Sequence, residues 1–221
     1  MSTEVAIVDY GVGNLLSVCR AFERCGAPPQ LVDTPAAVRA AEQLVLPGVG
    51  AFADALAELE RRGLINPIRD YAASGRPFLG ICLGMQLMLD SSEEFGHTEG
   101  LGLVPGRVIP VPPHGAGRRP HKIPHIGWNE LRRTSAKGTW DGTILEGIGD
   151  GESVYFVHSY MAVPDDDAAR LADCDYDGVP IPAVLQSGAM YGCQFHPEKS
   201  GPTGLSILRG FVALGQAAVG A

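Results

Sequence analysis

The 221-residue sequence lacks the long apolar runs that membrane proteins need. No stretch approaches the roughly 18 apolar residues of a spanning helix, and the N-terminus has no basic start followed by an apolar run. Hydrophobic residues make up 45% and charged residues 19%, a balance typical of a compact folded chain. We therefore expect a cytoplasmic protein with one domain over residues 1–221.

Regular cysteine spacing and excess positive charge are also missing. The five cysteines are an odd number at irregular intervals, which argues against a disulfide framework and favours a reducing compartment. The formal net charge of -8 makes nucleic acid and anionic membranes unexpected partners.

Signatures of cofactor and metal binding are absent as well. The turn at Gly11 and Gly13 begins like a dinucleotide-binding loop, but Leu16 stands where the third glycine would be. The histidines at 114, 121 and 125 lack compact ligand spacing and cysteine partners. We expect no metal and no cofactor.

The first half of the chain alternates short apolar runs with helical patterns. Strands are expected at 5–8, 31–32, 44–46 and 77–81, and helices at 15–22, after the N-cap Thr34, at 51–62 and at 83–89. Such tight βα repeats predict an α/β three-layer sandwich, a largely parallel sheet with helices on both faces.

The second half is richer in strands. We expect strands at 108–111, 128–131, 154–157, 181–185 and 190–195, a surface loop at 112–120 and a last helix from about Thr203. The sheet is therefore expected to be mixed.

The most informative segment surrounds Cys82. Gly80 and Gly84 stand two positions before and after it, between a predicted strand and a predicted helix. Small residues at these positions permit a sharp turn that raises a nucleophile above the sheet edge, at a helix start whose free N–H groups favour a thiolate. A free cysteine is more often a small buried apolar residue, so this turn alone leaves both interpretations open.

A thiol nucleophile needs a base, and the base needs an orienting group. His196 follows the last predicted strand, and Pro197 stiffens the chain so that Glu198 can fold back onto the imidazole. Together with the Cys82 turn, this arrangement predicts a catalytic triad of Cys82, His196 and Glu198.

These two segments carry a resemblance. GICLGMQ at 80–86 and QFHPEKS at 194–200 resemble the class I, triad-type glutamine amidotransferases. DYGVGNL at 9–15, PGVG at 47–50, PHIGWN at 124–129 and YFVHSY at 155–160 are similar to the glutaminase subunits of imidazole glycerol phosphate synthase within that family. The resemblance runs over nearly the whole chain and implies a flavodoxin-like sandwich.

The resemblance also implies functions for individual residues. It implies that glutamine is hydrolysed through a γ-glutamyl thioester and that ammonia passes to a (β/α)₈-barrel cyclase partner in a heterodimer of histidine biosynthesis. Carried over by position are oxyanion donors at Val49 and Leu83, substrate contacts at Gly48, Gly50, Gln86, Glu94, Ser159 and Tyr160, and partner contacts at Asn14, Trp128 and Tyr155. From spacing alone, Glu94 is equally well explained as a solvated charge.

One position departs from the pattern. Related subunits usually carry a lysine where this chain has Ser187, which puts a carried-over account of partner coupling in doubt. Three alternatives stay open: the ammonia-donating subunit of anthranilate or aminodeoxychorismate synthase, a catalytically silent regulatory subunit, and a standalone hydrolase of γ-glutamyl peptides.

Overall fold

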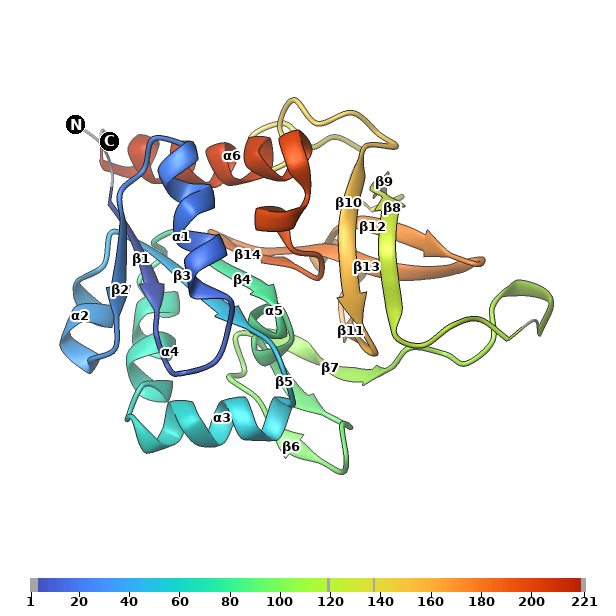
Figure 1. Cartoon of the computed structure of the whole chain (residues 1–221), viewed down its shortest axis with the longest axis horizontal. Coiled ribbons are helices and arrows are strands. Elements are labelled where there is room, and N and C mark those ends of the chain that lie inside the picture. The colour runs from blue at the N-terminus through green and yellow to red at the C-terminus, as the bar shows by residue number, and fades with distance from the viewer. Residues whose placement is uncertain (1–3, 119, 137, 220–221) are drawn as a thin grey trace.

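A computed structural model describes residues 4–118, 120–136 and 138–219 (Figure 1). Its largest sheet has eight strands in the order β2-β1-β3-β4-β14-β13-β12-β9. Neighbours from β2 to β14 are parallel, whereas β13, β12 and β9 continue the sheet in antiparallel pairing. The strands are β1 (Val5–Val8), β2 (Pro29–Val32), β3 (Gln43–Gly48), β4 (Phe78–Cys82), β9 (Arg132–Arg133), β12 (Arg170–Tyr176), β13 (Val179–Ser187) and β14 (Met190–Cys193).

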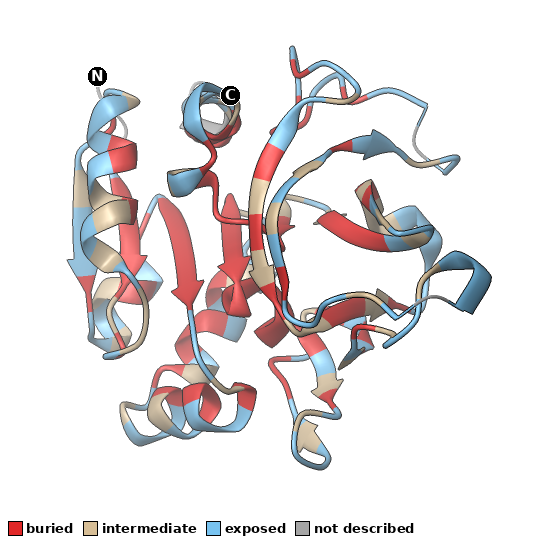
Figure 2. Ribbon diagram, turned by 45° about the vertical axis from the view of Figure 1, so that its right-hand side comes forward, coloured by how far each residue is buried: buried red, intermediate tan, exposed pale blue. Residues whose placement is uncertain are grey.

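Helices cover both faces of this sheet. They are α1 (Leu15–Arg24), α2 (Pro35–Ala40), α3 (Phe52–Arg61), α4 (Ile65–Ala73), α5 (Leu83–Leu87) and α6 (Gly201–Val219). Side chains of β1 alternate between two apolar cores, because successive residues of a strand point to opposite faces. Val5 and Ile7 join α1 and α6 in one core, and Ala6 and Val8 join α2, α3 and α4 in the other. Strands β1, β3 and β4, in the parallel part of the sheet, are buried at every residue (Figure 2). The predicted three-layer arrangement is confirmed.

Two smaller sheets lie beside the main one. One pairs β8 (His125–Glu130) with β10 (Ser153–His158), and the other has the order β11-β7-β5-β6. The strands of this four-stranded sheet are β5 (Leu89–Ser92), β6 (Thr98–Glu99), β7 (Val104–Pro110) and β11 (Tyr160–Pro164). The described residues also form three short 3₁₀ helices, η1 (Ala116–Arg118), η2 (Asp167–Ala169) and η3 (Pro197–Lys199). Among the described residues, no helix is long and apolar enough to cross a membrane.

Several elements differ from the sequence prediction. Helix α4 was not expected, and Pro67 lies in its first turn, where a missing N–H costs no helical hydrogen bond. The helix predicted for 83–89 ends at Leu87, and β5 begins at Leu89. Strands β11 and β12 were also missed. The run predicted as a strand at 190–195 leaves the sheet after Cys193.

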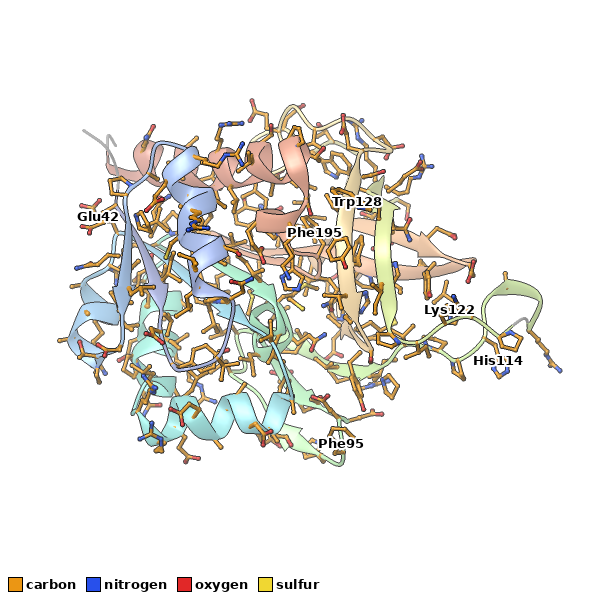
Figure 3. All side chains as sticks on the ribbon, viewed as in Figure 1. Glu42, Phe95, His114, Lys122, Trp128 and Phe195 are labelled. Carbon is orange, nitrogen blue, oxygen red and sulfur yellow. The ribbon has the colours of Figure 1, made fainter. Side chains whose placement is uncertain are left out.

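The loop predicted at 112–120 extends from the body of the molecule, as Figure 3 shows for His114. It rests on the β12–β13 turn, where the Ala116 N–H donates to the Asp177 carbonyl at 2.7 Å. Residue 119 lies outside the described residues. The loop is therefore a surface excursion with a defined contact to the main sheet.

Candidate active site

Cys82 ends β4 and immediately precedes α5, so a single residue makes the strand-to-helix turn. Its φ of +53° and ψ of -109° are uncommon for a residue with a side chain. A Cβ at Gly84 would lie 1.8 Å from the Leu46 carbonyl oxygen, and one at Gly80 would lie 2.7 Å from the Gly84 oxygen. Glycine is therefore required on both sides of this turn, and Cys82 is 7% exposed at its tip.

His196 is fixed by strand β10. Its backbone N–H donates to the Tyr155 carbonyl at 3.0 Å. The Ser200 hydroxyl donates to the His196 carbonyl at 2.6 Å and accepts from the Tyr155 N–H at 2.9 Å. The backbone on both sides of Pro197 is thus held against β10.

The imidazole of His196 is paired with Glu198, as the His-Pro-Glu turn predicted. Nδ1 of His196 lies 2.8 Å from Oε1 of Glu198, and both side chains are almost fully buried. Burial by itself lowers the pKa of His196, but interactions with Cys82 and Glu198 raise it to about 9. The other ring nitrogen, Nε2, is buried and has no hydrogen-bond partner among the described residues. Because Nδ1 is occupied by Glu198, Nε2 is the atom that can exchange a proton with Cys82.

A cavity of about 280 Å³ opens beside the thiol. Nine residues predicted for the site line it, drawn from five separate segments of the chain: Val49, Gly50, Cys82, Leu83, Gln86, Glu94, Ser159, Tyr160 and His196. The fold thus brings the predicted nucleophile, the predicted base, both predicted oxyanion positions and five of the predicted substrate contacts around one small space.

Glu94 has a structural contact that its sequence context did not show. Its Oε2 atom accepts a hydrogen bond from the Phe52 N–H at 2.6 Å, at the start of α3. A carboxylate is stabilised there by the free N–H groups of the helix end. Glu94 is therefore held at the cavity wall, and its interpretation as a freely solvated charge is wrong.

The other predicted residues lie outside the cavity lining. Gly48 packs beneath it, where a Cβ would be 2.7 Å from the Tyr10 hydroxyl oxygen. Asn14 caps α1 by accepting from the Ser17 N–H at 3.4 Å. Trp128 is 58% exposed on β8 (Figure 3) and contacts Tyr155 edge to face, with ring centroids 5.9 Å apart.

Sequence reasoning assigned no function to several residues at the site. Val157 and His158 line the cavity, and the Nε2 atom of Gln194, which is not part of the lining, lies 3.8 Å from the Cys82 sulfur. These residues lie inside segments that carried the resemblance. The sequence therefore indicated that their segments belong to the site, but it did not predict the contacts of the individual side chains. No group of three or more metal-binding side chains occurs in the described part of the chain.

Comparisons with known proteins agree with this geometry. The sequence model of the family "Glutamine amidotransferase class-I" matches residues 6–214. The chain is 57% identical over 212 residues to "Imidazole glycerol phosphate synthase subunit HisH 1" of Legionella pneumophila (strain Lens), covering 96% of this chain and 100% of the relative. It is 48% identical over 212 residues to the HisH subunit of Geobacillus kaustophilus, covering 95% and 96%.

A solved structure shows the same fold at low sequence identity. The structure of PurLQS from Thermotoga maritima aligns with a TM-score of 0.70 and 20% identity, covering 96% of this chain and 99% of that chain. The family match and the close relatives together show that the chain belongs to the class-I glutamine amidotransferases and, within them, to the HisH subunits of imidazole glycerol phosphate synthase.

Proposed function

We propose that this chain is a glutaminase subunit that hydrolyses L-glutamine to L-glutamate and ammonia for imidazole glycerol phosphate synthesis. The observation that carries the proposal is that Cys82 and His196 line one cavity and that Glu198 pairs with the His196 imidazole, in a member of the HisH family. Cys82 attacks the side-chain amide, and the proton that it loses passes through His196 to the departing ammonia. Water then hydrolyses the thioester with His196 as base, held by Glu198.

Negative charge develops on the carbonyl oxygen of the amide in the first step and of the thioester in the second, and it needs N–H donors. We assign this function to the backbone N–H groups of Leu83, the first residue of α5, and of Val49, which faces the same cavity. Gln86, Glu94, Ser159 and Tyr160 line the remaining wall and are assigned to the amino and carboxylate groups of glutamine. Gly50, in the same lining, and Gly48, at the end of β3, are assigned as further substrate contacts.

The ammonia is proposed to pass to a (β/α)₈-barrel cyclase subunit. That partner would form imidazole glycerol phosphate and aminoimidazole carboxamide ribotide in the cytoplasm. The docking surface includes the exposed apolar face of β8, where Ile126 and Trp128 are each 58% exposed. Tyr155 and Asn14 are assigned to the same interface. Ser187 ends β13, at the position where related subunits usually carry lysine. The contact that couples this chain to its partner must therefore differ at that position.

Glutaminase activity measured with and without the cyclase and its nucleotide ligand tests this proposal. We expect low activity for the isolated chain and strong stimulation by the liganded partner. Full activity without the partner would contradict the coupling, and no hydrolysis with the partner would favour a silent regulatory subunit. Capture of an anthranilate synthase subunit in place of the cyclase would redirect the ammonia to another synthase. Faster turnover of γ-glutamyl peptides than of glutamine would instead indicate a standalone peptide hydrolase.

A further inference from the structure

Gln194 places a fully buried amide beside the nucleophile. It follows β14 and precedes the turn that carries His196, and its backbone N–H donates to the Ala183 carbonyl at 2.9 Å. Its side chain is 0% exposed, and its Nε2 atom lies 3.8 Å from the Cys82 sulfur. A buried amide requires partners for both its oxygen and its nitrogen, so the identity of each partner matters.

The orientation of this amide is fixed by its neighbours. Nε2 of Gln86 donates to the Tyr160 carbonyl at 3.0 Å and to Oε1 of Gln194 at 3.0 Å. A backbone carbonyl can only accept, which identifies the Gln86 atom beside it as the nitrogen. Gln194 must then present its oxygen to Gln86, and its NH₂ group points to the thiol.

The Tyr160 carbonyl has a second buried partner. The Tyr160 carbonyl also lies 2.8 Å from Nδ1 of His158, whose Nε2 is 2.9 Å from Nδ1 of His125. Because the carbonyl accepts, His158 carries its proton on Nδ1 and accepts from His125. Burial lowers the pKa of both imidazoles, to about 3 for His158 and about 4 for His125. Neutral rings at physiological pH keep this order of donors and acceptors.

The sulfur of Cys82 has two opposite partners. It donates to the Val157 carbonyl at 3.8 Å and accepts from the Gln194 amide at 3.8 Å. An acceptor beside the sulfur stabilises the thiol, and a donor stabilises the thiolate. Once the thiol proton moves to Nε2 of His196, the Val157 contact has no hydrogen left to share, and the Gln194 donor stays on the sulfur beside the protonated imidazole.

We propose that Gln194 is a further catalytic residue, whose amide N–H stabilises the Cys82 thiolate. This inference rests on the proposed function, in which Cys82 is the nucleophile. The same hydrogen bond acts twice, because the thiolate is formed before attack and is released again when water cleaves the thioester. In both steps the proton is exchanged with His196, so no further reactant is required.

The test is the pH dependence of alkylation at Cys82 by iodoacetamide in the full chain, followed by mass spectrometry of the Cys82 peptide. Gln194→Met keeps an unbranched side chain of similar length and removes the donor. We expect the midpoint to rise by about one pH unit, with alkylation about tenfold slower below the midpoint. The ionisable groups near the thiol, His196 and Tyr10, are unchanged in this variant.

Gln186→Met is the matched control. Gln186 donates to the Tyr191 hydroxyl at 3.1 Å and does not line the cavity, so its variant should keep the wild-type midpoint. A folded Gln194→Met protein whose midpoint stays within about 0.2 pH units of wild type would overturn the proposal. If thermal unfolding shows that this variant does not fold, the alkylation midpoint of Gln194→Leu is measured in its place, and the same two results support or overturn the proposal. Absence of Cys82 alkylation in the wild type would instead contradict the proposed nucleophile.

Discussion

In the first half of the chain, backbone sterics set the position of Cys82, whereas in the second half hydrogen bonds to a neighbouring strand set the position of His196. Cys82 has a φ of +53°, between glycines where any Cβ would collide with backbone atoms. His196 is held through Tyr155 and Ser200, and its ring is held by Glu198. The two proposed catalytic groups thus meet at one cavity by different means.

This difference separates two kinds of sensitivity. A collision in a packed turn destabilises the whole protein, because the surrounding strands cannot move apart cheaply. A lost hydrogen bond to the imidazole leaves the fold in place and changes its protonation. Substitutions at the Cys82 turn should therefore change the free energy of unfolding. Substitutions around the imidazole should instead change the pKa of His196.

The largest expected effect is on activity, from Cys82→Gly. Removing the nucleophile should lower glutaminase activity with the partner present by at least about a thousandfold. Stability should stay within about 1 kcal/mol of wild type, because glycine relieves backbone strain that costs about 1–3 kcal/mol. Urea unfolding measures the second quantity, and a much larger loss of stability would show that the turn is not strained.

The next effect is on stability, from Gly84→Ala. The new Cβ would lie 1.8 Å from the Leu46 carbonyl oxygen, so we expect a loss of about 3 kcal/mol or more, or no folded protein. Gly149→Ala is the control, since its nearest atom would be 3.6 Å away. Its free energy of unfolding should change by less than about 0.5 kcal/mol. Equal unfolding curves for the two variants would contradict the claim that backbone sterics at the turn set the position of Cys82.

Glu198→Gln tests the second half of the chain. In the wild type the Cys82 and Glu198 interactions outweigh burial and raise the His196 pKa to about 9. Without the carboxylate charge, we expect this pKa to fall by about 1–3 units, with little change in the unfolding midpoint. An NMR titration of the His196 ring measures the pKa directly. An unchanged titration midpoint would mean that Glu198 does not control the protonation of His196.

The smallest effect is a change of stability with pH, in which the histidines oppose one another. The raised pKa of His196 stabilises the fold below pH 6.5, and this stabilisation is lost as the pH rises through about 9. The lowered pKa values of His125 and His158 reduce stability as the pH falls from 6.5 toward about 4 and about 3. Urea unfolding at a series of pH values should therefore show a maximum near pH 6.5. In Glu198→Gln, the free energy of unfolding should fall less steeply above pH 6.5, and its dependence on pH below 6.5 should not change.

The sequence was sufficient for features that depend on local sterics. Gly80 and Gly84 predicted the turn at Cys82, since the requirement for small residues is contained in a few neighbouring positions. Pro197 and Glu198 predicted the imidazole contact for the same reason. Short continuous apolar runs in the first half predicted the parallel strands, because a strand buried on both faces has apolar residues at successive positions.

Features that depend on distant partners were not predictable in this way. Gln194 acquires its contact from Cys82, 112 positions away, and Glu94 is fixed by the start of α3. Strand β12 was missed because it carries charges, and Arg170 and Asp173 form an ion pair with each other. Asn14, predicted at a partner interface, was found to cap α1. The interface assignment stays a prediction.

The central claim is that Cys82 is the nucleophile of a glutaminase. The most direct test is to treat the chain, together with its cyclase partner, with a glutamine-analogue electrophile and to locate the adduct by mass spectrometry. We predict a single adduct on the Cys82 peptide, formed in parallel with loss of glutaminase activity and blocked by excess glutamine. An unmodified Cys82 in a fully inactivated complex, or an adduct that glutamine does not block, would contradict the claim.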